Sequence, residues 1–153
     1  MSFLERVCAA LSAAGVRYAI VGGHAVALHG AVRGTVDVDV IVNWSKSALR
    51  KSESAFNKMD LVSRLPISAE DVYQFRKEYI ENRNLVAWNF YNPNDLSEQV
   101  DLIITSDLKA KKTRRIVLPG GDIRILAKAD LIAMKRSSGR PQDLEDIKAL
   151  ERL

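Results

Sequence analysis

The sequence contains one cysteine, Cys8, and no apolar run that approaches the length of a membrane span. A single cysteine can neither close an internal disulfide nor bind zinc by itself. The acidic Glu5 interrupts the N-terminal stretch in which a secretory signal would continue its apolar segment. These absences favour a protein of the reducing cytoplasm and predict no membrane partner.

Internal repeats, low-complexity tracts and linker-like segments are also missing from the 153 residues. That length suits one compact domain and is short for two. The composition, 47% hydrophobic and 27% charged, is ordinary for a folded protein and excludes a disordered or fibrous chain. We therefore predict a single domain over residues 1–153. Its net charge of +4 permits a phosphate-rich partner without requiring one.

Helical and strand-like patterns alternate along the chain, which predicts a mixed α/β (α+β) domain. Ser2 and Glu5 have the spacing of a helix capping box, and apolar residues then recur with helical period. Short apolar or alternating segments predict strands over residues 18–21, 35–43, 84–91 and 99–105, followed by a hairpin of 115–118 with 122–126. Helical patterns predict helices over residues 2–14, 24–29, 45–59, 68–82, 106–113, 129–137 and 141–153.

Two aspartates, Asp37 and Asp39, lie two residues apart on a predicted strand, so both side chains project from the same face. Neighbouring carboxylates repel each other unless a cation lies between them, and such a pair suits Mg²⁺ with its preference for carboxylate and phosphate oxygens. The Gly22-Gly23 pair follows a short buried strand, where exposed backbone N–H groups suit a phosphate. If the strand that carries Asp101 adjoins the first, three carboxylates could hold two metal ions.

Each of these features has an ordinary interpretation when taken alone. An Asp-x-Asp pair is common on a solvent-exposed edge strand, a Gly-Gly pair often forms only a turn, and Asp101 could be an exposed strand residue. Their order along the chain favours a combined site: a strand, a phosphate turn, a helix, and a strand with two carboxylates. We interpret this order as a metal-plus-triphosphate site.

The same residues resemble the polymerase β-type nucleotidyltransferase superfamily. The resemblance lies in Gly22-Gly23, a spacer of thirteen residues, Asp37-Val38-Asp39 and a later Asp101 between apolar neighbours. Within this superfamily, the chain is similar to AbiEii-type toxins and related small proteins from Tyr18 to about Leu150. That closer similarity is carried by the segments Gly22-Gly23-His24-Ala25, Arg33-x-Thr35-x-Asp37-x-Asp39, Asp130-Leu131-Ile132-Ala133-Met134-Lys135 and Arg140-Pro141-Gln142-Asp143-x-x-Asp146.

The resemblance implies a nucleotidyltransferase-like mixed sheet flanked by helices, with closing C-terminal helices. It implies an Mg²⁺-dependent nucleotidyltransferase in which one or two Mg²⁺ ions accompany a nucleoside triphosphate. The residues implied as both catalytic and metal-binding are Asp37, Asp39 and Asp101. The residues implied to bind or to adjoin the nucleoside triphosphate are Gly22, Gly23, Arg33, Thr35, Lys135, Arg140 and Asp143.

Three features depart from the family pattern. Gly23 stands where many catalytic members have a serine, which removes one hydroxyl contact to phosphate. Gln142 stands where the toxin motif usually has a basic residue. The chain is also shorter than the full-length toxins and shows no extra domain for a large substrate.

The resemblance leaves three functions open. The first is transfer of a nucleoside monophosphate to a hydroxyl of tRNA or protein, as the toxin of a toxin–antitoxin pair with an antitoxin partner. The second is modification of a small molecule such as an antibiotic. The third is a non-catalytic nucleotide- or RNA-binding module with the same fold, although three clustered carboxylates would have little purpose there.

The charged residues of the last two segments each have two interpretations. Lys135 is either a phosphate partner or part of a solvated helix face, and Asp143 and Asp146 either face solvent or orient Lys135 and Arg140. A basic run follows Asp101 and would either guide RNA towards the site or form a solvated face. This run comprises Lys109, Lys111, Lys112, Arg114 and Arg115.

Overall fold

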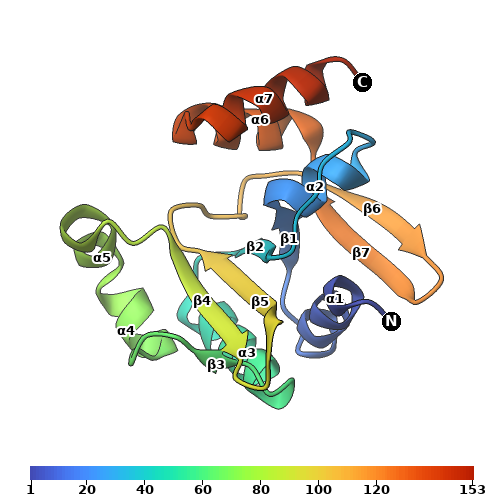
Figure 1. Cartoon of the computed structure of the whole chain (residues 1–153). Coiled ribbons are helices and arrows are strands. Elements are labelled where there is room, and N and C mark those ends of the chain that lie inside the picture. The colour runs from blue at the N-terminus through green and yellow to red at the C-terminus, as the bar shows by residue number, and fades with distance from the viewer.

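The computed structural model describes residues 1–153 and contains one mixed sheet of seven strands in the order β3-β4-β5-β2-β1-β7-β6 (Figure 1). Strand β2 pairs in antiparallel fashion with β1 and in parallel with β5, which places these three strands at the centre. The strands are β1 (Tyr18–Val21), β2 (Val38–Val42), β3 (Val62–Ser63), β4 (Ala87–Asn92), β5 (Asp95–Ile103), β6 (Thr113–Leu118) and β7 (Gly121–Leu126).

Seven helices flank this sheet. In Figure 1, α6 and α7 lie above α2, whereas α1, α3 and α4 lie lower in the view and α5 lies to one side. Helix α1 packs against α3 and β7, and α2 packs against β1, β2 and β7. The helices are α1 (Phe3–Ala13), α2 (Gly22–Leu28), α3 (Lys46–Lys58), α4 (Ala69–Gln74), α5 (Arg76–Arg83), α6 (Lys128–Ser138) and α7 (Pro141–Glu151).

The N-terminal helix confirms the prediction made from its capping residues. The Ser2 hydroxyl accepts a hydrogen bond from the backbone N–H of Glu5, and the Glu5 carboxylate accepts one from the backbone N–H of Ser2. Such a reciprocal pair satisfies N–H groups that the first helical turn leaves without partners. On the apolar face of the helix, Val7, Cys8 and Leu11 are completely buried.

The hydrophobic core is built on the central strands. All four residues of β1 are buried, as are four of the five residues of β2, which explains why their sequences are almost wholly apolar. Aromatic side chains fill the space under β4: the rings of Trp88 and Phe90 lie 4.6 Å apart and those of Phe56 and Phe90 lie 5.0 Å apart, centroid to centroid. A rigid sheet of this kind gives the polar residues at its strand ends fixed positions.

Several predicted boundaries are wrong. The strand predicted over residues 35–43 begins at Val38, so Asp37 lies in a bend just before β2. Helix α2 begins at Gly22, so the glycine pair forms its first turn and does not precede it. The single helix predicted over residues 68–82 is two helices, α4 and α5, which are separated at Phe75. The boundaries of α2 and β2 thus differ from the predicted ones by a few residues, and the order of strand, glycine pair, helix and aspartates is unchanged.

The basic helix predicted over residues 106–113 is absent, because long-range hydrogen bonds hold this segment as a loop. One carboxylate oxygen of Asp107 accepts hydrogen bonds from the backbone N–H groups of Trp44 (2.9 Å) and Lys109 (3.0 Å). The Arg17 guanidinium donates to the carbonyl oxygens of Leu108 (3.0 Å) and Lys111 (2.9 Å). Carbonyl groups that a helix would use internally are therefore bound from outside.

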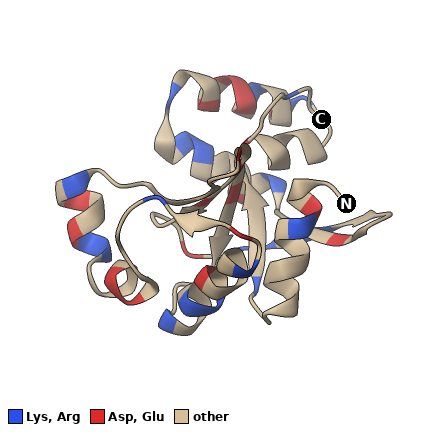
Figure 2. Cartoon of the chain, turned by 60° about the horizontal axis from the view of Figure 1, so that its bottom comes forward, with Lys and Arg blue, Asp and Glu red and all other residues tan.

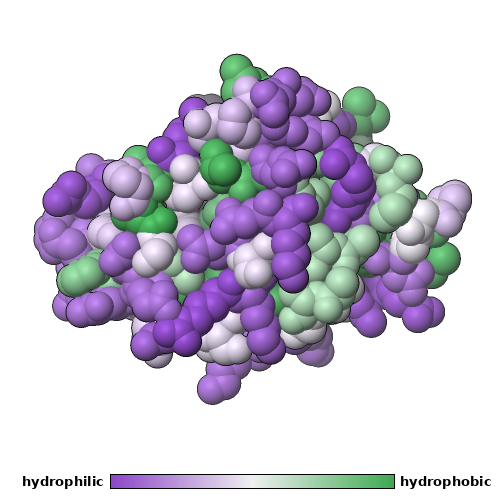
Figure 3. Space-filling model, turned by 90° about the horizontal axis from the view of Figure 1, so that it is seen from below, coloured by the Kyte–Doolittle hydropathy of each residue, from purple (hydrophilic) through white to green (hydrophobic).

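Residues of both charge signs occur on the helices, while most of the ribbon of the sheet is uncharged (Figure 2). The face seen from below is mostly hydrophilic, and hydrophilic side chains interrupt its apolar areas (Figure 3). A large continuous apolar patch, which marks many docking surfaces, is absent from that face. No helix of the chain combines the length and the apolar composition that crossing a membrane requires.

Candidate active site

The centre of the site is the parallel pairing of β2 with β5. Asp39 lies in register with Asp101 of β5 on one side and with Val21 of β1 on the other. Residues in register on adjacent strands project from the same face, a few ångströms apart. The two carboxylates therefore lie side by side, which confirms that the strand of Asp101 adjoins that of Asp39. Asp37 stands two residues earlier, at the entrance to β2.

All ten residues predicted for the site line one cleft of about 400 Å³. They come from the turn into α2, the loop before β2, strands β2 and β5, and the helices α6 and α7. The lining contains no large apolar side chain. Such a lining suits a polyanion, because polar side chains can take the place of part of its hydration shell. The cleft is lined by Gly22, Gly23, Arg33, Thr35, Asp37, Asp39, Asp101, Lys135, Arg140, Pro141, Gln142 and Asp143.

Both glycines of the turn allow close approach of another side chain. Gly22 has φ +66°, and a Cβ built on it would collide with the carboxylate of Asp39. A Cβ built on Gly23 would lie 2.7 Å from Cβ and 3.0 Å from Oγ1 of Thr35. The glycines therefore let Asp39 and Thr35 lie directly against the backbone of the turn, a reason for glycine that the sequence did not show.

The three candidate metal-binding carboxylates form no ion pair. Burial, reinforced by the charges of Asp101 and Asp37, raises the pKa of Asp39 to about 7. Burial and the charge of Asp101 also raise the pKa of Asp37. Raised pKa values are typical of like charges that share a site without a counter-ion. Lys135 and Arg140 act in the opposite direction on Asp39, but burial and the neighbouring carboxylates outweigh them, and no cation of the chain forms an ion pair with the cluster.

The C-terminal helices present the opposite pattern, a continuous chain of ion pairs. Arg33 Nε lies 3.0 Å from Asp146, Lys135 Nζ lies 2.8 Å from Asp146 and 3.6 Å from Asp143, and Arg140 Nε lies 2.8 Å from Asp143. Lys135 is only 6% exposed, so it does not belong to a solvated helix face. Asp143 and Asp146 of α7 are also buried and orient Lys135 and Arg140. They therefore do not face solvent, which was the other interpretation of these aspartates.

The pKa of Asp143 shows that this pairing outweighs burial. Burial acts to raise the pKa of Asp143, but hydrogen bonds from Arg140 and the charges of Arg140 and Lys135 hold it below its usual value. The Arg140 side chain is 75% exposed and extends into the same cleft as Asp39. The cleft therefore has an anionic wall on the sheet and a cationic wall on the helices.

Two residues that the sequence did not indicate support the third carboxylate. Asn89 of β4 lies in register with Asp101, and its amide Nδ2 donates to Asp101 Oδ1 at 2.8 Å. The Arg64 Nε atom donates in turn to Asn89 Oδ1 at 2.8 Å. Only the register between β4 and β5 brings Asn89 to Asp101, and no local pattern in the sequence gives that register. Asn89 and Arg64 thus hold one oxygen of Asp101 in place.

The donor set fits a hard divalent cation. Asp37, Asp39 and Asp101 offer only carboxylate oxygens, the ligands that Mg²⁺ prefers. No three Asp, Glu, His or Cys side chains of the chain are close enough together to hold an ion alone. Mg²⁺ usually binds to one or two carboxylates and takes its other ligands from substrate phosphates and water. The donor atoms therefore fit Mg²⁺ in kind, and the three side chains alone do not complete a metal site.

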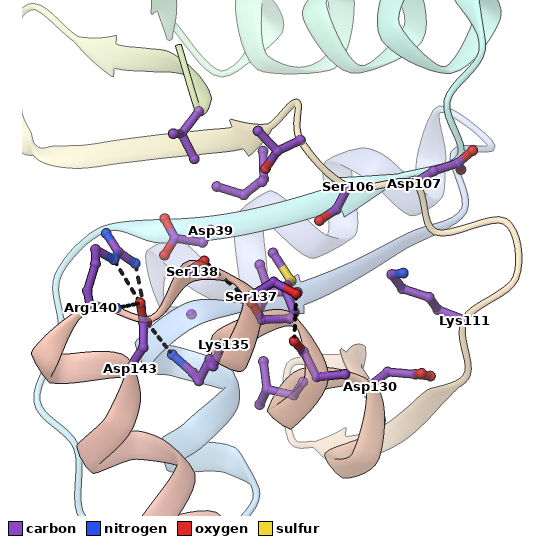
Figure 4. A pocket seen from close by; sticks show the side chains of 18 of the residues that line it. Asp39, Ser106, Asp107, Lys111, Asp130, Lys135, Ser137, Ser138, Arg140 and Asp143 are labelled. Atoms are coloured by element: carbon purple, nitrogen blue, oxygen red, sulfur yellow. Dashed lines mark hydrogen bonds and ion pairs between the residues drawn. The ribbon is translucent and has the colours of Figure 1, made fainter. Parts of the chain in front are cut away.

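A larger cleft of about 670 Å³ adjoins the first and shares Gly22, Asp39, Lys135, Arg140 and Asp143 with it. In Figure 4, Asp39 and Arg140 lie at one end and Lys111 at the other, with Ser106 and Ser137 between them. The remaining lining includes the apolar side chains of β5, α6 and the segment before β4. Its mixed lining suits an organic group with hydroxyls, in contrast to the polar smaller cleft.

No protein-family model and no curated protein matches the sequence. Among solved structures, the chain is similar to the crystal structure of an antigenic nucleotidyltransferase-like protein from Paracoccidioides brasiliensis. The two share 16% sequence identity and a TM-score of 0.61, over 96% of this chain and 72% of that chain. At this identity the similarity concerns the fold. The chain therefore has a nucleotidyltransferase-like fold, and the mixed sheet flanked by helices confirms the predicted fold class.

Proposed function

We propose that the protein is an Mg²⁺-dependent nucleotidyltransferase that transfers a nucleoside monophosphate from a nucleoside triphosphate to a hydroxyl group. The observation that carries this proposal is the group of Asp37, Asp39 and Asp101 in one cleft, where none of the three forms an ion pair and Asp39 lies against Gly22. Keeping carboxylates together without ion pairs costs free energy, and folding alone does not explain that cost. A cation that binds with the substrate would explain it, because the cation would neutralise the carboxylates.

The chain's residues would divide the work between the two walls of the smaller cleft. Carboxylates of Asp37, Asp39 and Asp101 would supply part of the ligands of the metal and the triphosphate the rest, and bound Mg²⁺ would neutralise charge on the triphosphate and on the leaving pyrophosphate. On the opposite wall, Lys135 and Arg140 would contact phosphate oxygens. Positioning and charge neutralisation are the main contributions that a protein makes to this class of reaction.

The transfer forms one bond and breaks one. The acceptor hydroxyl oxygen bonds to the α-phosphorus, the bond from that phosphorus to the oxygen bridging to the β-phosphorus breaks, and pyrophosphate leaves. The proton of the hydroxyl would pass to a carboxylate, for which Asp101 is suited because Asn89 fixes one of its oxygens and leaves the other available. The larger cleft, which meets the smaller one at Asp39, offers room for a group beyond the triphosphate.

We propose tRNA or a protein as the hydroxyl acceptor, in a toxin of the AbiEii type with an antitoxin partner. The sequence motifs support this choice, and the loop with Lys109, Lys111 and Lys112 next to the larger cleft favours an anionic acceptor. Modification of a small molecule such as an antibiotic is the alternative that the same two clefts permit. Label found in small metabolites would favour that alternative.

Labelled α-phosphate transfer tests the proposal. Each of the four nucleoside triphosphates, labelled at the α-phosphate, is incubated with Mg²⁺ and with total RNA, cell protein or small metabolites. We expect label in one fraction, lost in the variant Asp37→Asn/Asp39→Asn. Asp122→Asn, which removes an exposed carboxylate of β7 that lines neither cleft, is the matched control. Triphosphate binding without any transfer would favour the non-catalytic binding module, and absence of binding would contradict both.

A further inference from the structure

Asp146 lies at the point where the three segments around the smaller cleft meet. Its carboxylate accepts hydrogen bonds from Arg33 Nε (3.0 Å), Gln142 Nε2 (3.0 Å) and Lys135 Nζ (2.8 Å). Arg33 belongs to the loop before β2, Lys135 to α6, and Gln142 to α7. One carboxylate therefore ties together the loop that precedes Asp37 and both closing helices.

The Asp146 side chain is 3% exposed and lines neither cleft. It therefore does not contact a ligand bound in either cleft. Its donors do line the smaller cleft: Arg33, Lys135 and Gln142 all contribute to that wall. Any effect of Asp146 on a bound ligand must pass through these side chains.

The carboxylate of Asp146 is held in its charged form. Burial acts to raise the pKa of Asp146, but hydrogen bonds from Lys135, Gln142 and Arg33 hold it below its usual value. A buried carboxylate with several donors has little rotational freedom, because donors on both of its oxygens fix the orientation of the group. Asp146 is thus suited to fixing its donors in one arrangement.

We propose that Asp146 is a positioning residue that holds Lys135 and Arg33 in place for the phosphates of a nucleoside triphosphate. The inference rests on the proposed function, because it assigns the cationic wall of the smaller cleft to the triphosphate. Lys135 has four rotatable side-chain bonds, and Asp146 removes most of their freedom before a ligand binds. Such preorganisation increases affinity because less conformational entropy is lost on binding.

A purely neutralising role for Asp146 has the opposite consequence. If Asp146 only lowered the positive charge of this wall, Asp146→Asn would make the wall more cationic and would strengthen binding of an anion. If Asp146 positions Lys135 and Arg33, the same substitution weakens binding although it adds positive charge. The direction of the change in affinity therefore separates the two roles.

The test is calorimetric titration with inorganic tripolyphosphate and Mg²⁺, a probe that needs no knowledge of the base or the acceptor. We expect Asp146→Asn to bind this probe about tenfold more weakly than the wild-type protein. Glu145→Gln, on the exposed side of the same helix, is the matched control and should bind as the wild type does. Equal or tighter binding by Asp146→Asn would overturn the proposal.

Asp146→Glu gives a second measurement that does not depend on removing a buried charge. It keeps the negative charge but moves the carboxylate by one methylene group, so positioning predicts weaker binding and neutralisation predicts no change. The ¹⁵Nζ–H signal of Lys135, which a fixed hydrogen bond slows in exchange, should be visible in the wild-type protein and lost in Asp146→Asn. A Lys135 signal retained in Asp146→Asn, together with an unchanged affinity of Asp146→Glu for the probe, would contradict the positioning role.

The same titrations distinguish a failure of the proposed function from a failure of this inference. If the wild-type protein does not bind Mg²⁺ and tripolyphosphate, the triphosphate site itself is wrong and the inference falls with it. If the wild-type protein binds the probe and both Asp146 variants bind it equally well, only the inference is wrong.

Discussion

Asp39→Asn should make the metal-free protein more stable at alkaline pH while it abolishes nucleotidyl transfer. The reason is the pKa of Asp39, which burial and the neighbouring carboxylates raise from 3.8 to about 7. A carboxyl group with a raised pKa in the folded state contributes stability that is fully present below pH 3.8 and is lost as the pH rises through about 7. Asparagine has nearly the same shape and carries no charge to destabilise the fold.

The magnitude follows from the size of the shift. A change from 3.8 to about 7 corresponds to about 4 kcal/mol at 1.36 kcal/mol per pH unit, of which roughly 2.5 kcal/mol is lost between pH 5 and pH 8. These values are upper bounds, because the carboxylate keeps some contact with solvent. At pH 8, we therefore expect a higher free energy of unfolding for Asp39→Asn, by about 2 to 4 kcal/mol.

The assay is urea unfolding in EDTA at pH 5, 6, 7 and 8, followed by fluorescence of the completely buried Trp88. The stability difference between Asp39→Asn and the wild type should grow with pH and level off above pH 8. The same samples, given Mg²⁺ and labelled nucleoside triphosphate, should show transfer only for the wild type. A difference that is independent of pH, or a variant less stable than the wild type at pH 8, would refute the reasoning.

Three further predictions concern residues around the carboxylates. Asn89→Ala removes a hydrogen bond to the third carboxylate and should lower kcat about tenfold, with a stability loss of about 1 kcal/mol, measured by transfer kinetics and urea unfolding. Gly23→Ser should weaken binding of Mg²⁺ and tripolyphosphate, because its Cβ would clash with Thr35, and calorimetry that shows unchanged binding would contradict this. If RNA is the acceptor, Lys111→Gln/Lys112→Gln should reduce the slope of log affinity against log salt by about 2, and an unchanged slope would exclude contact with RNA phosphates there.

Local patterns predicted the elements that local forces determine. The capping box of Ser2 and Glu5 predicted α1 almost to the residue, because its hydrogen bonds span only three residues. The apolar runs predicted β1 and most of β2, and the predicted hairpin is β6 and β7, which turn at Pro119 and Gly120. In each case the residues that specify the element also lie inside it.

Contacts between distant residues determined what the sequence did not predict. The helix expected over residues 106–113 is a loop because Arg17, about ninety residues earlier, binds its carbonyl groups. Asn89 acquires its place beside Asp101 from the pairing register of β4 and β5. Likewise, only the fold shows that Asp146 collects donors from three segments. Sequence spacing can indicate that residues share a motif, but it does not give the partners of each side chain.

Partners distinguish the five aspartates of this region, which look alike as residues in a sequence. Asp143 and Asp146 are buried with arginine and lysine side chains, and their pKa values are lowered accordingly. Asp37 and Asp39 lack such partners and have raised pKa values, and Asp101 receives only a neutral amide. A fold selected for stability alone would pair or replace unneutralised carboxylates, as it has paired the first two. The three that form no ion pair are the three that the motif places together, which is why the proposed function assigns them a cation from solution.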